Sequence, residues 1–425
     1  MARLWIKGMV LAVLAFVSEA PAQPPATPPQ PPSTIVLRTA TLLDGRGAVL
    51  KSSDIVVVNG KIQSVGGKAP AGATVYDLRG FTVLPGMIDT HEHIFYHFRN
   101  GRFAGMQAKD ETPEEAMLAA AENGGVILNA GFTTIQSPGP GRTSDLILKD
   151  AYARGILPGP RLLTSLEWFR FDPPGSAPPP QRLREMVRER KAQGADFIKI
   201  FASASIRDAG TPLLDQEQMN ALCGEARAQG LRTLVHAYNV AVRMAIEAGC
   251  TTIEHGTNGM TPEVVAMMVQ KGVYYDPTIG LAGRNYVENR EKFIGLGNYT
   301  AQGMDELEAK LKRNLPPTEF TEAIRDPRLK VVFGTDAVAG GHGRNGLELV
   351  YRVRQGGMDP MRAVESMTSM AAESLGLGDS IGSIAPGYDA DIVALDGNPL
   401  TDIDAVMRPL FVMKQGVVVK FTPKP

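Results

Sequence analysis

The chain has 425 residues, of which 44% are hydrophobic and 21% charged, and its formal net charge is −1. This length accommodates one large domain and a smaller one, and the composition is ordinary for a globular protein. The nearly neutral charge gives no reason to expect nucleic acid or an anionic membrane as a partner. Cys223 and Cys250 are the only cysteines, so the chain is not a disulfide scaffold, and we expect both to be buried small hydrophobic residues.

The N-terminus has the three parts of a secretory signal peptide. A basic start is followed by an apolar stretch at residues 9–17 and by the small-residue cleavage site Ala-Pro-Ala at 20–22. The apolar stretch is too short for a stable transmembrane anchor, which needs about 20 residues, although an uncleaved anchor is the alternative. We therefore expect a Sec-type signal peptide at residues 1–22 and a periplasmic or secreted protein with no membrane partner after cleavage. Residues 23–33 read as a proline-rich linker.

Both ends of the remaining chain are rich in short strands and tight turns. Asn59-Gly60 and Gln415-Gly416 are two-residue turn signals of the kind that join hairpin strands. The predicted strands are residues 35–38, 54–58, 61–65, 74–77, 391–395, 411–414 and 417–420. This pattern predicts a small composite β-sandwich domain assembled from residues 34–82 and 383–425.

Between these ends, apolar strands alternate with helical stretches, which predicts βα units and a parallel sheet. The predicted strands are residues 83–88, 133–136, 161–164, 197–201, 233–236, 252–254, 273–276 and 330–333. We therefore assign the α/β class and expect a (β/α)₈ barrel of the TIM type over residues 83–382.

Several helix starts are marked by capping residues. Thr112, Thr261 and Asp359 each precede a proline, and Asp215 with Gln218 can form a capping box. Residues 280–328 are too long for a simple βα connection and favour helix. We expect them to form a helical insertion over the mouth of the barrel.

Histidines and an aspartate stand at the ends of the predicted barrel strands. His91 and His93 alternate on one strand end, so their side chains face the same way. His236 and His255 end two consecutive strands, and Asp336 follows the run at 330–333. A His-x-His pair alone is weak evidence. For Asp336 the alternative of a helix N-cap or loop acid is weak, because a hydrolytic metal site recruits a carboxylate among imidazoles. Together, at the strand ends where barrel enzymes keep their chemistry, they predict a metal site.

Lys199 is unusual because it lies inside an otherwise apolar strand, at 197–201. A buried ammonium is costly unless an acid pairs with it, which is the structural alternative. The functional interpretation is that CO₂ has converted the amine to a carbamate, an anionic ligand that can bridge two metals. Such a carbamate, Asp336 and a bridging hydroxide would offset most of the charge of two divalent ions.

Five motifs then resemble the amidohydrolase superfamily, in its imidazolonepropionase-like branch with a carboxylated lysine, which includes Xaa-Pro dipeptidases and ochratoxinase-like hydrolases. They are LPGMIDTHEH at 84–93, GADFIKI at 194–200, IEHG at 253–256, GTDA at 334–337 and GYDADIVALD at 387–396. The resemblance implies a two-metal centre, with zinc as the expected metal. His91, His93 and Asp336 would bind one ion, His236 and His255 the other, and carboxylated Lys199 would bridge them.

On this reading the substrate is a small molecule with an amide bond, such as an N-acyl amino acid or a dipeptide-like compound. A hydroxide shared by the ions would attack the carbonyl, and Asp336 would be the catalytic acid and base. We expect substrate contacts from the loops after the strands. The candidates are Tyr238, His342, Arg344 and Arg170.

Other functions stay open from the sequence. The same metals could hydrolyse a carbamate, an ester or a lactone, and a mononuclear deaminase would not need Lys199. A catalytically silent scaffold is disfavoured because every ligand position is filled. His97 lies beyond the strand end and reads as a structural neighbour rather than a ligand. The sequence leaves open whether the protein forms a homo-oligomer.

Overall fold

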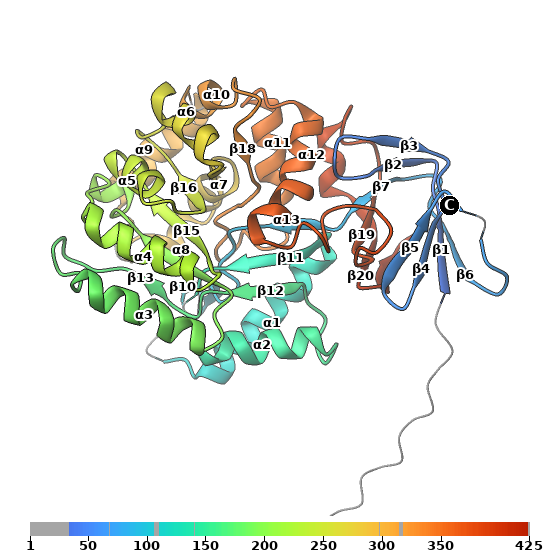
Figure 1. The fold of residues 1–425 in the computed structure, drawn as a ribbon, viewed down its shortest axis with the longest axis horizontal. Helices are drawn as coiled ribbons and strands as arrows, with labels where there is room; N and C mark the ends of the chain where they lie inside the picture. The colour runs from blue at the N-terminus through green and yellow to red at the C-terminus, as the bar shows by residue number, and fades with distance from the viewer. Residues whose placement is uncertain are drawn as a thin grey trace, which may run out of the picture.

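The computed structural model describes residues 34–423, apart from residues 68, 106–109, 140, 297 and 314–317. The predicted signal peptide and proline-rich linker lie outside the described residues. Figure 1 shows a larger part in which strands alternate with helices, and a smaller part made of strands from both chain ends. Within the described ranges, no helix is both long enough and apolar enough to cross a bilayer.

The smaller part consists of two sheets, with strand orders β5-β4-β1-β6 and β21-β20-β19-β7-β2-β3. The strands are β1 (Thr34–Arg38), β2 (Thr41–Leu43), β3 (Val49–Lys51), β4 (Ile55–Val58), β5 (Lys61–Val65), β6 (Thr74–Asp77), β7 (Thr82–Pro85), β19 (Ile392–Leu395), β20 (Pro409–Lys414) and β21 (Val417–Phe421). Leu37, Ile55 and Phe411 belong to one buried apolar cluster contributed by both sheets. The two chain ends therefore share one core. The sequence analysis did not predict β2 and β3, which are very short strands.

The predicted strand at 83–88 proves to be two strands with different partners. β7 pairs antiparallel with β19 in the smaller part, whereas β8 (Met87–Asp89) pairs parallel with β11 in the larger part. The chain changes sheet at Gly86, where an added Cβ would lie 2.1 Å from the Thr133 hydroxyl oxygen. Only glycine permits this close approach, so a continuous apolar run conceals a boundary between two sheets.

The described residues of the larger part contain eight barrel strands, each of which overlaps a predicted strand, although the first begins only at Met87. They are β8, β11 (Phe132–Ser137), β12 (Arg161–Thr164) with its extension β13 (Trp168–Phe169), β14 (Phe197–Phe201), β15 (Arg232–Ala237), β16 (Thr252–His255), β17 (Tyr274–Asp276) and β18 (Lys330–Val331). A small hairpin, β9 (His97–Arg99) and β10 (Arg102–Ala104), follows the first strand.

Backbone hydrogen bonds close these strands into a ring. The Asp196 amide donates to the Thr164 carbonyl (2.8 Å), which joins the β12 and β14 segments. On the other side, the His93 amide donates to the Ala337 carbonyl (2.9 Å), and Glu92 and Ala337 form a parallel bridge. The first and last strands are therefore neighbours, as a (β/α)₈ barrel requires.

Helices cover the outside of the barrel, and the predicted caps are present at Thr112, Asp215, Thr261 and Asp359. The helices are α1 (Pro113–Asn129), α2 (Thr143–Ala153), α3 (Pro180–Ala192), α4 (Gln216–Ala228), α5 (Val240–Glu247), α6 (Pro262–Lys271), α11 (Gly346–Arg354), α12 (Pro360–Ser366) and α13 (Ser369–Leu375), with the 3₁₀ turns η1 (Ile206–Asp208) and η2 (Ile403–Met407).

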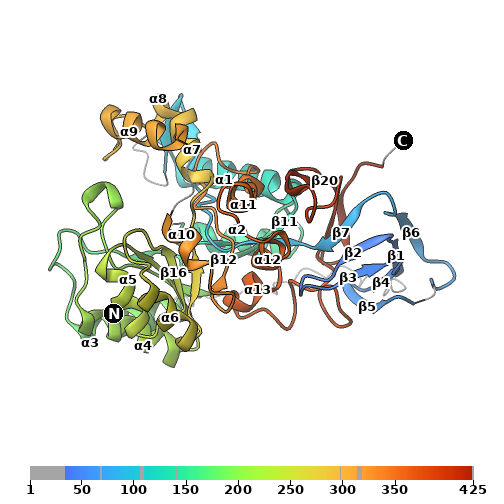
Figure 2. The same ribbon diagram turned by 90° about the horizontal axis from the view of Figure 1, so that it is seen from above.

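The predicted helical insertion is also present, as α7 (Leu281–Glu288), α8 (Arg290–Phe293), α9 (Ala301–Lys312) and α10 (Thr318–Ala323). In Figure 2, α7, α8 and α9 stand together at one side of the barrel, away from the smaller part. Their shared core with the loop after β8 includes Tyr286, Phe293 and Tyr96.

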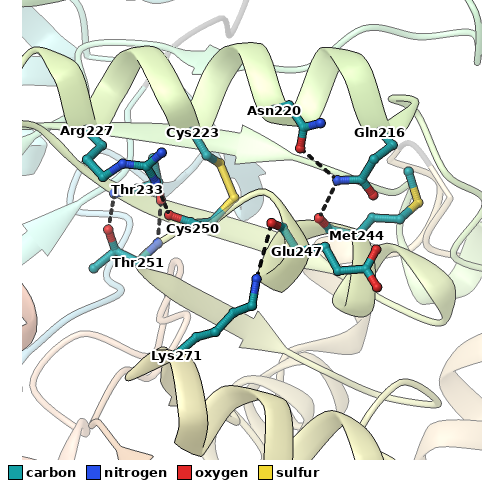
Figure 3. Close-up of a disulfide and its surroundings, with 11 residues drawn as sticks. Gln216, Asn220, Cys223, Arg227, Thr233, Met244, Glu247, Cys250, Thr251 and Lys271 are labelled. Carbon is teal, nitrogen blue, oxygen red and sulfur yellow. Dashed lines mark hydrogen bonds between the residues drawn. A yellow bond between two sulfur atoms is a disulfide. The ribbon is translucent and has the colours of Figure 1, made fainter.

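The two cysteines are not free, which corrects the expectation that they act only as small hydrophobic residues. Cys223 on α4 and Cys250 in the turn before β16 form a disulfide with a Cα–Cα distance of 5.1 Å (Figure 3). Both are almost completely buried. A pair separated by 27 positions has no spacing signature, so only the packing of α4 against this turn brings the sulfurs together.

Candidate metal centre

His91 and His93 lie directly after β8, at the C-terminal end of the first barrel strand. Both side chains are buried, and their ring centroids are 5.2 Å apart. Asp336 follows the last strand, and its Oδ1 lies 3.1 Å from His93 Nε2 and 3.4 Å from His91 Nε2. Barrel closure thus gathers three possible ligands, whose donor atoms all lie within 4.8 Å of one another.

His236 on β15 and His255 at the end of β16 form an adjoining pair. His255 Nε2 lies 3.0 Å from His236 Nδ1, and the ring centroids of His255 and His91 are 5.7 Å apart. The two groups of ligands therefore meet at the centre of the barrel mouth.

Lys199, on β14, points toward these candidate ligands at the barrel mouth. Its side chain is buried, and its Nζ lies 3.4 Å from His91 Nε2. No carboxylate of the described residues lies within 4.0 Å of this nitrogen, so the acid partner of the structural alternative is not found there. Burial lowers the pKa of Lys199, which favours the neutral amine, the form that reacts with CO₂.

Two of these residues adopt a left-handed backbone conformation that residues other than glycine rarely adopt. The φ angles of His255 and Asp336 are 66° and 52°. Such conformations cost about 1–3 kcal/mol and concentrate at functional sites. At both positions the strand has just ended, so this conformation decides where the last side chain points.

Glu254 is a member of the site that the sequence interpretation did not assign. His91 Nδ1 donates a hydrogen bond to Glu254 Oε2 at 2.6 Å, deep in the barrel. With Glu254 as the acceptor, this contact would keep the ring proton of His91 on Nδ1 and leave Nε2 facing Asp336 and Lys199. His255 Nδ1 is held in the same way by the Thr278 hydroxyl, at 2.5 Å. The IEHG motif contained the signal, since its glutamate lies on a buried strand next to a ligand.

The electrostatic state of the centre suits metal binding. Burial lowers the pKa of His255 to about 4 and those of His91 and His236 well below the ordinary histidine value. Burial alone would raise the pKa of Asp336, but the neighbouring histidines hold it well below its usual range. At neutral pH the imidazoles of His91, His236 and His255 are therefore uncharged and Asp336 is a carboxylate, which are the forms that bind metals.

The donor set also fits divalent metals chemically. Imidazole nitrogens with one carboxylate are a common zinc ligand set. His236 Nε2 is buried and has no hydrogen-bond partner among the described residues. A buried polar atom without a partner is costly, and a bound ion would satisfy it.

Comparison with known proteins settles the family. The profile described as "Amidohydrolase family" matches residues 82–419, most of the chain. The chain belongs to the amidohydrolase family. It is 29% identical to the ochratoxinase of Aspergillus niger over 235 residues, covering 54% of this chain and 46% of that protein. It is 23% identical to the imidazolonepropionase of Kosmotoga olearia, covering 88% of this chain and 92% of that protein.

Among solved structures, the fold is similar to a Xaa-Pro dipeptidase with bound methionine in the active site. The TM-score is 0.78 at 27% identity, covering 91% of this chain and 100% of that chain. The matched segment spans about half the length of the ochratoxinase. These likenesses confirm the α/β fold and the expected branch of the amidohydrolase family.

Around the centre, aromatic rings pack against the histidines. Tyr238 lies parallel to His255, with centroids 5.2 Å apart, and Tyr96 lies parallel to His93 at 4.8 Å. The Phe201 and His236 centroids are 4.7 Å apart. The structure thus places Tyr238 beside the predicted ligands, and its contact with substrate stays a prediction.

The structure changes the interpretation of His342 and Arg344. His342 Nδ1 lies 2.7 Å from Glu92 Oε1, and its Nε2 lies 2.7 Å from the Tyr96 carbonyl oxygen, so both nitrogens are already engaged. Arg344 pairs with Glu288 at 2.7 Å. Hydrogen bonds thus hold the His342 ring, and Arg344 already has a carboxylate partner; contact of either residue with substrate stays a prediction.

Arg170 has both a partner and a place near the centre. Its Nε donates to Asp172 Oδ2 at 2.5 Å, while its guanidinium lies 5.2 Å from the ring centroid of Phe201. His97 bonds to Glu111 and to the Phe95 carbonyl, which confirms that it is a structural neighbour and not a ligand.

Proposed function

We propose that this amidohydrolase-family chain hydrolyses an amide bond in a small N-acyl amino acid or dipeptide-like substrate. The proposal is supported by the convergence of five candidate metal-ligand side chains on a buried lysine that has no carboxylate within 4.0 Å among the described residues. The named relatives, an ochratoxinase and a Xaa-Pro dipeptidase, support a carbon–nitrogen bond as the target.

Two divalent ions, with zinc as the first choice, would be held by these residues. His91, His93 and Asp336 would hold one ion, and His236 and His255 the other. Lys199, converted to a carbamate, would be a further ligand and would supply negative charge to the centre. When bound, such ions lower the pKa of water and polarise a carbonyl group.

The protein's own groups supply the proton transfers. Asp336 accepts the proton of the attacking water, whose oxygen adds to the carbonyl carbon of the amide. Asp336 then donates this proton to the leaving nitrogen as the C–N bond breaks, which yields a carboxylate product and an amine. Glu254 keeps the His91 ring in one tautomer, and Tyr238 limits access of bulk water beside His255.

The decisive experiment is product analysis by mass spectrometry. Zinc-loaded, bicarbonate-treated protein is incubated with Xaa-Pro and other dipeptides, N-acyl amino acids, aryl amides, carbamates, lactones and aminated heterocycles. Release of an amino acid or amine from an amide is the expected result. Release of ammonia from a heterocycle would overturn the proposal and identify a deaminase. Cleavage of lactones or carbamates alone would show that the enzyme hydrolyses one of those bonds and not an amide.

Lys199→Ala provides the matched test of the two-metal arrangement. We expect it to bind fewer zinc ions per chain by elemental analysis and to lose activity. A small added carboxylate such as acetate should restore part of both, because it can take the place of the carbamate. Full metal content and activity in Lys199→Ala would remove the carbamate from the proposal.

We also propose that the enzyme is exported. The predicted signal peptide at residues 1–22 supports this, and so does the buried disulfide, since disulfides persist mainly in oxidising compartments. N-terminal sequencing of the protein from a periplasmic or culture fraction should give Gln23 as the first residue. A cytoplasmic full-length chain would contradict export.

A further inference from the structure

We propose that Arg207 binds the carboxylate of the substrate and so restricts the enzyme to acidic amides. This inference rests on the proposed hydrolysis and names the substrate group that the barrel mouth recognises. Arg207 lies on η1, in the loop between β14, which carries Lys199, and α4. It was not among the residues that the sequence singled out.

The loop that carries Arg207 packs against Tyr238 and Asn239, beside the candidate metal centre. Asn239 Nδ2 donates to the Ala209 carbonyl at 2.8 Å, and a Cβ on Gly210 would lie 2.8 Å from the Tyr238 Cβ. Tyr238 in turn lies parallel to His255. The Arg207 charge is within electrostatic reach of Tyr238, His255 and Asp336.

The helical insertion fixes the guanidinium from the other side. It lies 4.3 Å from the ring centroid of Tyr299 and 5.9 Å from that of Tyr286. Arg207 Nε donates to Asn298 Oδ1 at 3.0 Å. A small cavity lined by these residues lies beside it. Aromatic faces hold a guanidinium without neutralising it, so its planar fork stays available to a carboxylate.

Charge pairing distinguishes Arg207 from the other arginines of the barrel mouth. Arg170 pairs with Asp172, and Arg344 pairs with Glu288. Within the described part of the chain, no carboxylate lies within 4.0 Å of the Arg207 guanidinium. A fixed cation near a centre that binds metal cations is unfavourable unless an anion joins it. A substrate carboxylate supplies that anion and gains charge-assisted hydrogen bonds.

The test compares N-benzoyl-L-amino acids with their uncharged C-terminal methyl amides. In Arg207→Met we expect kcat/KM for the acids to fall roughly 10²- to 10³-fold, mainly through KM, because one partner of a charged pair is removed. For the methyl amides we expect less than about a threefold change. Arg290→Met, an arginine of the helical insertion that is paired with Asp305, is the matched control and should change neither. Arg207→Lys should recover part of the preference for acids.

Direct binding separates failure of this inference from failure of the proposed function. Titration calorimetry of N-benzoyl-L-phenylalanine with zinc-loaded protein should show weaker binding to Arg207→Met than to the wild type and to Arg290→Met. Equal affinities would overturn the role of Arg207, even if amides are hydrolysed. If neither acids nor amides are cleaved but the binding difference holds, the hydrolysis proposal fails and the carboxylate site stands.

Discussion

The two halves of the candidate metal centre are held in place by different means. The half that carries His91, His93 and Asp336 rests on a network of buried polar and charged side chains. The half that carries His236 and His255 rests on apolar packing and a disulfide. One site thus depends on two kinds of interaction: polar contacts, which respond to pH and to loss of a partner, and a disulfide, which responds to reduction.

In the first half, Asp89 and Glu92 on either side of His91 are buried carboxylates. Asn345 Nδ2 donates to Asp89 Oδ2 at 2.7 Å and also donates to Glu92, and the Thr335 hydroxyl donates to Asp89 Oδ2 at 2.7 Å. His342 completes the set through Glu92. These contacts connect the first strand to the end of the barrel, so they fix its closure.

In the second half, the disulfide links α4 to the turn before β16, and thus joins the units that carry His236 and His255 (Figure 3). Beside it, the Thr251 amide donates to the Thr233 hydroxyl at 2.7 Å, and Arg227 donates to the Gly249 carbonyl at 3.2 Å. The surrounding core is apolar. This half should therefore respond to reduction, and the first half to loss of polar partners or to pH.

The largest effect is expected at Asp336, where the first half carries the proposed acid and base. Asp336→Asn should keep its metal but lose about 10²- to 10⁴-fold in kcat, because the amide accepts no proton from water. Steady-state kinetics with elemental analysis measure both. Asp305 is an exposed acid on α9, so Asp305→Asn is the control variant. Full activity of Asp336→Asn would contradict the assigned role of Asp336.

The disulfide should dominate the stability of the second half. For a loop closed across 27 positions, the chain-entropy model gives about 3–4 kcal/mol. Cys223→Ala combined with Cys250→Ala should lower the free energy of unfolding in urea by this amount. The wild type should fall similarly in reductant, whereas the double variant should not respond to it. A reductant-insensitive wild type would show that the crosslink contributes little.

A smaller effect is expected for His342 in the first half. His342→Phe removes a hydrogen-bond partner of buried Glu92 and of the Tyr96 carbonyl, which should cost about 1–3 kcal/mol of stability. Urea unfolding measures the cost. If His342 instead contacted substrate, KM would rise while stability stayed unchanged, and that result would restore the sequence-based expectation.

The last prediction concerns how the stability of the protein depends on pH through Asp145, on α2. Burial raises its pKa to about 7, and its Oδ2 accepts a 2.6 Å hydrogen bond from the Thr164 hydroxyl. Since this folded pKa is above the unfolded value, its contribution is present at low pH and is lost as pH rises from about 4 to about 7. The slope is about 1.4 kcal/mol per pH unit for one group. Asp145→Asn should remove this slope from stability measured between pH 5 and 7, and an unchanged slope would contradict it.

Much of the fold follows from local sequence signals. The barrel strands, the helical insertion and the caps were predictable because apolar periodicity and capping residues act over a few positions. The candidate ligands were predictable for the same reason, since each follows a recognisable strand end. The split at Gly86 was not, because β7 and β8 differ only in which distant strand each one meets.

The sequence by itself therefore determined the order of the elements and the residues at the mouth of the barrel. Tertiary structure alone decided which side chains meet there. The Cys223–Cys250 bond, the contact of Glu254 with His91 and the contact of Arg207 with Asn298 all depend on segments far apart in the chain. No local pattern encodes such distances, because they arise only when the barrel closes and its loops pack against one another.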